Sequence, residues 1–367
     1  MPDDRAGKPE NTSTELHDRH QRNEAQVHEQ SRGRAGAITP METRRLGPKG
    51  PVITRFGLGM AALGRPAYIN LRHGEDFSEG RSVEAMEEHS CRVLDRALTA
   101  GIRYFDAARS YGRAEPFLRS WIDRRGLRPD DIVVGSKWGY KYTGEWQVDG
   151  RVQEVKDHSE AMLKTQVVES TSILSPYLRL YQIHSAALET RVLDDQGVLE
   201  ELRRLREKGL LLGVTTTGPR QLETIRRAIA IRFDSEPLFS SVQATWNLLE
   251  RRAEPALREA HEAGFTVLVK EALANGRLTL NGDEGTTGPL RTVADRLHCS
   301  PDTVALAFVM KERWADVILL GASTIEQIES NLRAPEVQLC PEDLEILNAL
   351  RLPAEDYWAS RARLAWN

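Results

Sequence analysis

The amino-acid sequence predicts an α/β fold, a (β/α)8 or TIM barrel built as a single domain. Short apolar runs alternate with amphipathic helical runs along most of the chain, eight apolar runs can be counted, and they are rich in Val, Ile and Leu. Alternation at this spacing indicates parallel strands joined by right-handed crossovers. Eight strands, each followed by a helix, close naturally into a barrel whose active site lies at the carboxyl ends of the strands.

The predicted elements follow one another through mostly short connections. Helix 82–100, for example, places most of its apolar side chains on one face, as an amphipathic helix requires. The predicted strands span residues 52–59, 102–105, 132–137, 178–183, 210–215, 240–244, 265–269 and 317–320. The predicted helices span residues 82–100, 114–125, 159–174, 195–208, 219–230, 252–263, 289–297, 301–312 and 324–334.

An open, doubly wound parallel sheet is the alternative to the barrel, and it predicts a dinucleotide-binding glycine fingerprint in the first βα turn. Residues 57–64 read GLGMAALG, which has the first two glycines of that fingerprint but not the spacing of the third. A polar loop through Gly80 also separates this turn from the next helix. Because the match is partial, the barrel is favoured.

Residues 1–40 differ in composition from the rest of the chain. They are polar and contain almost no large apolar side chain. Such a segment cannot offset its loss of conformational entropy by burial. We therefore predict a disordered polar tail over residues 1–40 and a folded barrel domain over residues 41–367.

The composition argues against several classes of protein. The net charge is −4 with no long block of one sign, so neither nucleic acid nor a membrane surface is an expected partner. The three cysteines, Cys91, Cys299 and Cys340, lie far apart in no metal-binding spacing, as a reducing compartment allows. His73 with Asp76 offers too few ligands for a metal. We expect a cytoplasmic protein, without a metal, that acts on a small molecule.

Four polar residues follow three neighbouring strands, where a barrel carries its chemistry. Asp106 and Tyr111 come after the second strand, Lys137 ends the third, and His184 follows the fourth. Each of them alone is more often an ion-paired or capping residue than a catalyst. Together, however, they form a coherent acid–base set on one rim of the barrel.

A phenol has a pKa of about 10, too high for easy proton transfer at neutral pH. A nearby ammonium such as Lys137 favours the phenolate and is expected to lower the pKa of Tyr111. Asp106 can hold Lys137 charged and in place, and His184 can orient a carbonyl oxygen. Tyr111 is then a general acid for an oxygen that gains negative charge, which fits reduction of a carbonyl by hydride transfer.

The run FDAARSYGRAEPFL resembles the signature of the aldo-keto reductases, Asp-x-Ala-x-x-Tyr-Gly-x-x-Glu. Lys137 in VVGSKWG and His184 in YQIHS fall where that family places its other two catalytic residues, and the similarity extends from about residue 41 to residue 350. The resemblance implies an NAD(P)H-dependent barrel enzyme that reduces an aldehyde or ketone to an alcohol, with Asp106, Tyr111, Lys137 and His184 as its catalytic residues.

The resemblance also implies where a coenzyme binds. Gly59 and Met60 would meet the nicotinamide side and Gln243 the carboxamide, while residues 273–278 would cover the pyrophosphate. The complete implied set is Gly59, Met60, Asp106, Thr215, Gln243, Leu273, Gly276, Gly321, Ser323, Gln327 and Asn331. The segment around Gly321 resembles NADP-binding branches of the family, so NADP(H) is favoured and NAD(H) is the alternative.

The sequence departs from the family pattern at three places. Thr215-Thr216 replaces the frequent Ser-Asn after the fifth strand. Lys270 ends the seventh strand, near which many members stack an aromatic ring on the nicotinamide. Gly321 and Gln327 stand where some members read the coenzyme's 2′-phosphate with Lys or Arg, and a phosphate prefers such charged donors.

The substrate pocket is expected from the loops above the rim and from aromatic side chains next to the catalytic residues. Tyr68, Trp138 and Trp246 are the candidates. A function of a different class is a coenzyme-binding regulatory or interaction module. The β subunits of voltage-gated potassium channels resemble the family and act partly in that way, but they usually carry Asn where this chain has His184. A short-chain reductase is not supported, because no tyrosine here has a lysine four residues later.

Overall fold

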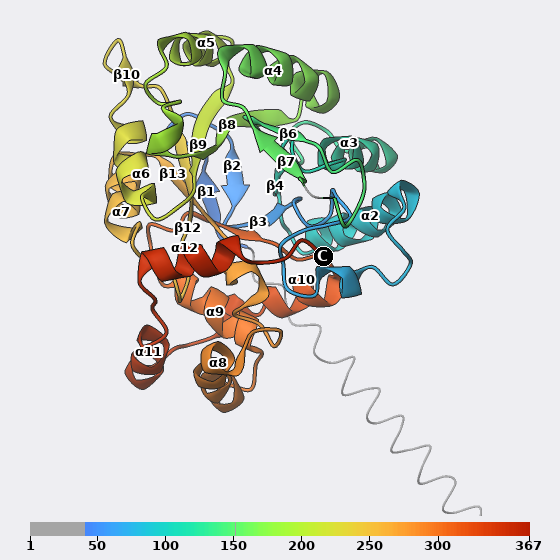
Figure 1. Cartoon of the computed structure of the whole chain (residues 1–367), viewed down its shortest axis with the longest axis vertical. Coiled ribbons are helices and arrows are strands. Elements are labelled where there is room, and N and C mark those ends of the chain that lie inside the picture. Colours follow the sequence, from blue (N-terminus) through green and yellow to red (C-terminus); the bar gives the residue numbers. More distant parts are fainter. Residues whose placement is uncertain (1–40, 151) are drawn as a thin grey trace, which may run out of the picture. The chain divides into compact units, whose positions relative to one another are not determined.

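Eight parallel strands close into a barrel in the computed structural model, which describes residues 41–150 and 152–367 (Figure 1). Pairing of the last strand with the first closes the barrel and confirms the predicted fold. The predicted disordered tail lies outside the described residues, and the domain boundary at residue 41 stays a prediction. In order around the barrel, the strands are β3 (Phe56–Gly59), β4 (Tyr104–Asp106), β5 (Val133–Trp138), β8 (Leu178–Ala186), β9 (Leu211–Thr216), β12 (Ser241–Thr245), β13 (Thr266–Lys270) and β14 (Val317–Leu320).

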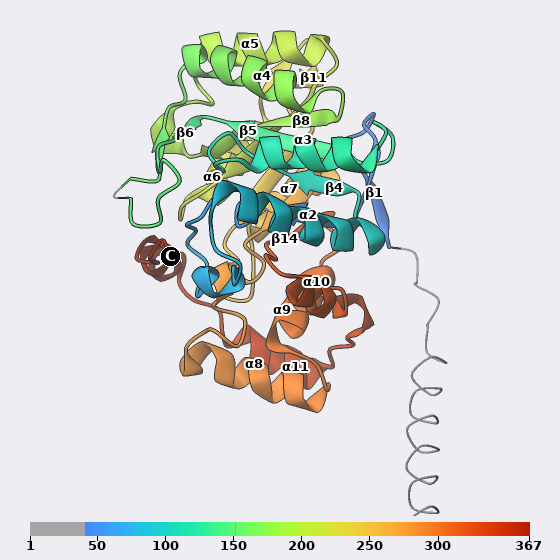
Figure 2. The same cartoon turned by 90° about the vertical axis from the view of Figure 1, so that its right-hand side faces the viewer.

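Helices surround the strands, and Figure 2 shows α2, α3, α4 and α5 as successive neighbours, in agreement with their contacts. None of the helices in the described ranges combines the length and hydrophobicity that a membrane crossing requires. The helices between and after the strands are α2 (Val83–Thr99), α3 (Ala114–Arg125), α4 (Glu160–Leu174), α5 (Gln196–Glu207), α6 (Gln221–Ile229), α7 (Glu254–Glu262), α8 (Glu284–Arg296), α9 (Pro301–Met310) and α10 (Ile325–Asn331).

Helix α2 illustrates how the sequence specifies these elements. The Ser82 side chain accepts a hydrogen bond from the Ala85 amide and so caps the first turn. One apolar face of the helix is buried against the strands. The next helix anchors the strand that carries Asp106, because Trp121 of α3 packs on Phe105 of β4 with ring centroids 5.2 Å apart.

The predicted strand 52–59 is divided in two. β1 (Thr43–Arg45) and β2 (Val52–Thr54) form an antiparallel hairpin, and only β3 belongs to the barrel. Ile53 of the hairpin joins the same buried cluster as Tyr104 and Val317, which lie near the amino ends of their strands. Ile53 and Thr54 of β2 are buried like residues 56–58 of β3, so the hydrophobicity of the run does not reveal the division.

Several short elements lie outside the repeating βα pattern. Helix α8 begins at Glu284 rather than at the predicted residue 289, because the Asp283 side chain caps it there. The additional elements are the hairpins β6 (Tyr140–Tyr142) with β7 (Glu154–Lys156) and β10 (Arg232–Phe233) with β11 (Glu236–Pro237), the 3-10 turns η1 (His73–Asp76), η2 (Leu188–Thr190), η3 (Ala274–Gly276) and η4 (Ala334–Glu336), and the helices α11 (Pro341–Asn348) and α12 (Ala354–Ala362).

The strand register brings the carboxyl ends of neighbouring strands together. Gly59 at the end of β3 pairs with Asp106 at the end of β4, and Asp106 pairs with Gly135 of β5. Lys137 lies two residues beyond Gly135 and therefore on the same face of the strand. The chemistry expected from the sequence is thus concentrated at one rim of the barrel.

Candidate active site

A buried ion pair between Asp106 and Lys137 lies at the centre of this rim. Lys137 Nζ also donates a hydrogen bond to the backbone oxygen of Ala107 at 2.9 Å. The second oxygen of Asp106, Oδ1, accepts hydrogen bonds from the Tyr104 hydroxyl and from Gln182 Nε2, both at 3.1 Å. A buried charge pair of this kind needs its remaining donors and acceptors satisfied, and these neighbours supply that.

Gly135 leaves the space in which the Tyr104 phenol sits. A Cβ atom at position 135 would lie 2.3 Å from the Tyr104 hydroxyl oxygen and 3.3 Å from Asp106 Oδ1. Any larger residue there would displace the phenol from the carboxylate. The sequence therefore needs glycine opposite Asp106 for the hydrogen bond of Tyr104 to form.

Tyr111 lies beside the ion pair and faces the cavity described below. Its hydroxyl is 3.4 Å from Lys137 Nζ and 3.5 Å from His184 Nε2. The other ring nitrogen of His184, Nδ1, is 3.4 Å from Ser110 Oγ. The structure thus brings together the four residues that the sequence singled out, from the ends of β4, β5 and β8 and the loop after β4.

A β-bulge sets the position of His184. The register between β8 and β9 shifts between Ile183 and Ala186, and Ser185 has a positive φ of 53°. The Ser185 amide donates to Thr215 Oγ1 at 2.6 Å, which supports the irregular backbone. Such bulges reorient side chains at barrel rims. Thr215 is therefore found beneath the bulge.

Burial, aided by neighbouring charges, keeps both Tyr111 and His184 neutral. Burial raises the pKa of Tyr111, the carboxylate of Asp106 raises it further, and Arg65 opposes the shift. Burial, together with the positive charge of Lys137, holds the pKa of His184 well below its ordinary value. The expected lowering of the Tyr111 pKa by Lys137 is not found, because burial raises this pKa and the carboxylate of Asp106 raises it further.

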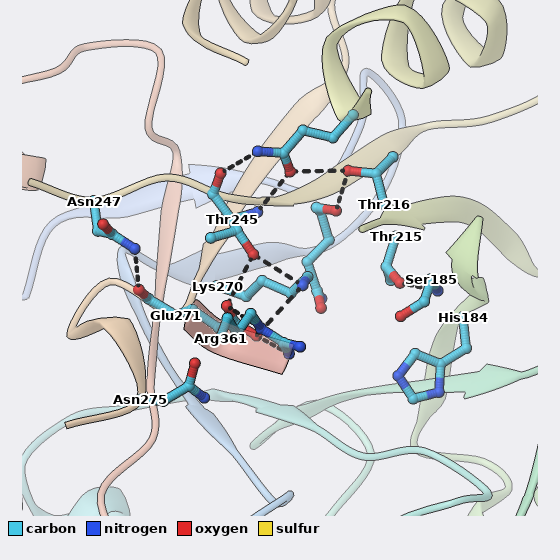
Figure 3. A network of polar contacts seen from close by, with 12 residues as sticks. His184, Ser185, Thr215, Thr216, Thr245, Asn247, Lys270, Glu271, Asn275 and Arg361 are labelled. Atoms are coloured by element: carbon cyan, nitrogen blue, oxygen red, sulfur yellow. Dashed lines mark hydrogen bonds and ion pairs between the residues drawn. The ribbon is translucent and has the colours of Figure 1, made fainter. Parts of the chain in front are cut away.

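A second polar cluster surrounds Lys270 at the cavity wall, and its other members, Glu271 and Arg361, were not indicated by the sequence (Figure 3). Glu271, just after β13, forms an ion pair with Arg361 of α12. Lys270 Nζ donates to Thr245 Oγ1 at 3.0 Å and lies 3.8 Å from Glu271 Oε1. Burial alone raises the pKa of Glu271, but the charges of Arg361 and Lys270 outweigh it and lower that pKa to about 2. Burial lowers the pKa of Lys270 to about 8.

Arg65 is a further buried side chain that the sequence did not single out. Its guanidinium forms an ion pair with Glu154 and lies 5.1 Å from the centre of the Tyr111 ring. It also lies over the rings of Tyr68 and Trp366, 4.8 Å and 4.7 Å from their centres. Arg65 thereby joins the loop after β3 and the carboxyl-terminal tail next to the phenol of Tyr111.

A cavity of about 580 Å³ extends from Tyr111 and His184 to Ser323 and Asn331. Most of the residues that the resemblance assigned to coenzyme binding line it: Gly59, Asp106, Gln243, Leu273, Gly276, Gly321, Ser323, Gln327 and Asn331. Met60 and Thr215 are fully buried and are not among the described lining residues. Lys137 is likewise buried behind Tyr111.

Two of the three predicted substrate-pocket residues do not reach this cavity. Tyr68 lines it, but among the described residues Trp138 and Trp246 are not part of its wall. Trp138 is buried with its ring 5.8 Å from that of His158. Trp246 is buried against Phe308, 5.7 Å away, and belongs to the packing between β12 and α9. The prediction is corrected for these two tryptophans, whose apolar surface fills the core.

The described residues contain no cluster of three or more His, Cys, Asp or Glu side chains that could hold a metal ion. The polar groups that the site does present are the phenol of Tyr111 and the imidazole of His184, next to the ion pair of Asp106 with Lys137.

Comparison with known proteins gives consistent matches. The model of the aldo/keto reductase family matches residues 78–351. The oxidoreductase YqkF of Bacillus subtilis is 24% identical over 84% of this chain and 96% of its own length. Norsolorinic acid reductase stcV of Emericella nidulans is 23% identical over 71% of each chain. Among solved structures, the holo form of aldo-keto reductase AKR11C1 from Bacillus halodurans has a TM-score of 0.64 at 22% identity, covering 87% of this chain and 99% of that one.

Proposed function

The chain belongs to the aldo/keto reductase family, and on that basis we propose that it reduces an aldehyde or ketone to an alcohol with NAD(P)H. The observation that carries the proposal is the position of the Tyr111 hydroxyl. It lies at the cavity wall, within 3.5 Å of both Lys137 Nζ and His184 Nε2. A proton donor in that setting is what a carbonyl oxygen needs as it becomes an alkoxide.

Tyr111 is the general acid in this proposal. A bound reduced nicotinamide would supply the hydride to the carbonyl carbon. The phenol gives its proton to the carbonyl oxygen, so that hydride and proton together convert C=O into CH–OH. The raised pKa of Tyr111 keeps this proton in place until the oxygen becomes more basic than the phenolate.

Lys137 and His184 support that transfer in different ways. The ammonium of Lys137 lies 3.4 Å from the hydroxyl that becomes a phenolate, so it attracts the charge that forms there. His184 is neutral and lies on the cavity side, where an imidazole nitrogen can hydrogen-bond the carbonyl oxygen and orient it. Asp106 holds the ammonium and is itself held by Tyr104 and Gln182.

The residues around the cavity fit a nicotinamide dinucleotide. The cavity runs from the catalytic phenol to a group of hydroxyl and amide side chains, and Asn275 Oδ1 and Asn331 Oδ1 are buried without a hydrogen-bond partner among the described residues. Gln243 would hold the nicotinamide carboxamide, residues 273–278 would cover the pyrophosphate, and residues 321–331 would bind the adenosine. The resemblance of the sequence around Gly321 to NADP-binding members of the family favours NADP(H), whereas the contacts of the Asp76 carboxylate with Ser323 and Gln327 favour NAD(H).

The substrate would bind above Tyr111. Tyr68, Trp366 and Leu364 line that part of the cavity, and Arg65 lies behind the two rings. The aromatic walls suit a carbonyl compound with an apolar body, and small aldehydes and ketones are the substrates proposed.

A panel of aliphatic and aromatic aldehydes and ketones, tested for loss of reduced-coenzyme absorbance with NADH and NADPH in parallel, tests this function. Turnover of at least one carbonyl is expected. Coenzyme binding without turnover of any carbonyl would contradict the proposal and would favour the regulatory module, for which the described residues offer no specific support.

A further inference from the structure

Asp76 reaches the far end of the cavity from a part of the chain distant in sequence. It ends the 3-10 turn η1, in the loop after β3. Its carboxylate accepts hydrogen bonds from Ser323 Oγ and, at 3.1 Å, from Gln327 Nε2. Gln327 is fixed in turn, because its Oε1 accepts the Ser323 amide at 2.8 Å. The two side chains proposed to bind the adenosine end therefore already direct their donors at a carboxylate.

The loop that carries Asp76 is tied down at several points. The Leu71 amide donates to the backbone oxygen of Asn275 at 3.0 Å, which joins the loop to the segment after β13. Asn367 Nδ2 donates to the Asn70 oxygen at 2.9 Å, which joins it to the carboxyl-terminal tail. These contacts hold the Asp76 carboxylate at the cavity wall.

The charge at this end of the cavity is negative. Asp302 and Glu326 line it together with Asp76. The cationic lining residues, Arg65, Lys270 and Arg361, belong to the catalytic end, and none of the described lining residues contributed by η1, α9, α10 or the segment between β14 and α10 is Lys or Arg. Asp302 already accepts Asn331 Nδ2 at 2.8 Å.

An acidic wall of this kind treats the two nicotinamide coenzymes differently. A carboxylate only accepts hydrogen bonds, and the ribose hydroxyls of NAD(H) can donate to it. The 2′-phosphate of NADP(H) carries close to two negative charges, needs donors, and would meet carboxylates instead. It would also have to take Ser323 Oγ and Gln327 Nε2 away from Asp76.

We propose that Asp76 is a specificity-determining residue, which accepts a hydrogen bond from the adenosine ribose and makes the protein prefer NAD(H) to NADP(H). The inference rests on the proposed function only in taking a nicotinamide coenzyme as the ligand. It reverses the preference that the sequence pattern around Gly321 suggested, because that pattern contains no information on the loop that packs against it.

The test measures binding rather than turnover. Dissociation constants of NAD⁺ and NADP⁺, and of the fragments 5′-AMP and adenosine 2′,5′-bisphosphate, are determined by calorimetry on the full chain. The ligands without the 2′-phosphate are expected to bind at least about tenfold more tightly, the size of one charge-assisted hydrogen bond. Equal affinity, or tighter binding of the 2′-phosphorylated ligands, would overturn the proposal.

Asp76→Asn removes the charge and keeps the shape. It is expected to tighten NADP⁺ binding about tenfold and to weaken NAD⁺ binding severalfold. The matched control is Glu75→Gln, which removes the same charge from the adjacent, exposed carboxylate that pairs only loosely with Arg72 at 3.9 Å. The control is expected to change neither constant.

Equal changes for both coenzymes in Asp76→Asn would show that Asp76 only fastens the loop, and would overturn the proposal. A protein that binds NAD⁺ selectively and reduces no carbonyl would contradict the proposed function and leave this inference standing. The two failures are therefore distinguishable.

Discussion

Tyr111 and His184 lie 3.5 Å apart, and burial displaces their pKa values in opposite directions. The phenol is held protonated because its pKa is raised above the ordinary value. The imidazole is held neutral because its pKa is lowered below the ordinary value. Neither group titrates near neutral pH, so the proposed proton donor Tyr111 stays protonated and His184 stays uncharged.

The pH dependence of reduction follows from these two shifts. We expect kcat/KM to be level between about pH 6 and pH 9, since neither the ordinary imidazole pKa nor the ordinary phenol pKa applies here. Lys270, whose pKa is lowered to about 8, also lines the cavity. A change in kcat/KM near pH 8 that is absent in Lys270→Met is assigned to the titration of Lys270. A change near pH 8 that persists in Lys270→Met would contradict the raised pKa of Tyr111.

Tyr104 acts on the site through Asp106. Tyr104→Phe removes the 3.1 Å hydrogen bond to a buried carboxylate, which is expected to lower the free energy of unfolding by about 1.5–3 kcal/mol. It is also expected to reduce kcat more than it changes KM, since Asp106 positions Lys137. Tyr177→Phe is the control, because its hydroxyl donates to the backbone oxygen of Leu127 away from the site. Urea unfolding measures the change in the free energy of unfolding of both variants, and steady-state kinetics measure kcat and KM. An unchanged kcat in Tyr104→Phe would contradict the positioning role of Tyr104.

Helix α12 illustrates what one element adds to the barrel. Arg361 of this helix forms an ion pair with Glu271, next to β13, so the carboxyl-terminal tail is fastened to the cavity wall (Figure 3). The pKa of Glu271 is lowered to about 2 in the folded protein. A depressed carboxyl pKa contributes stability that is present above the unfolded value of about 4.5 and is lost as the pH falls toward 2.

Arg361→Met removes the charge that outweighs the burial of Glu271. We expect the free energy of unfolding at pH 7 to fall by about 3 kcal/mol, and the loss of stability between about pH 4.5 and pH 2 to become smaller than in the wild type. Arg363→Met, at an exposed position just beyond the same helix, is the control. Urea titrations at neutral and acid pH measure both, and equal stabilities of the two variants at pH 7 would contradict the role of the ion pair.

At the level of elements, the sequence pattern predicted the eight barrel strands and most helices, because apolar strand runs alternate regularly with amphipathic helical runs along the chain. The pattern did not predict the elements that depart from the repeating βα unit. In the run 52–59, Ile53 and Thr54 are buried like Phe56 and Leu58, so its hydrophobicity does not reveal that β2 pairs in a hairpin outside the barrel. Helices α11 and α12 follow the last repeat; α11 contacts α8, and α12 is joined to Glu271 after β13.

In the whole molecule, the site residues that the sequence predicted are those at or near strand ends. The residues that were not predicted reach the site through contacts between segments distant in sequence. Tyr104 and Gln182 each lie two residues before a predicted site residue on the same strand face, a signal that could have been used. Asp76 meets Ser323, and Glu271 meets Arg361, across long stretches of chain, and only the folded barrel brings them together.

The central claim is that the Tyr111 phenol delivers the proton. Tyr111→Phe removes that proton and little else, and it is compared with Tyr177→Phe, which loses a hydroxyl outside the cavity. The measurement is the rate of carbonyl reduction at saturating coenzyme, together with the coenzyme dissociation constant. The account predicts a rate lower by about 10²- to 10⁴-fold in Tyr111→Phe with the dissociation constant unchanged within about twofold, and no loss of rate in the control. Undiminished reduction by Tyr111→Phe would contradict it.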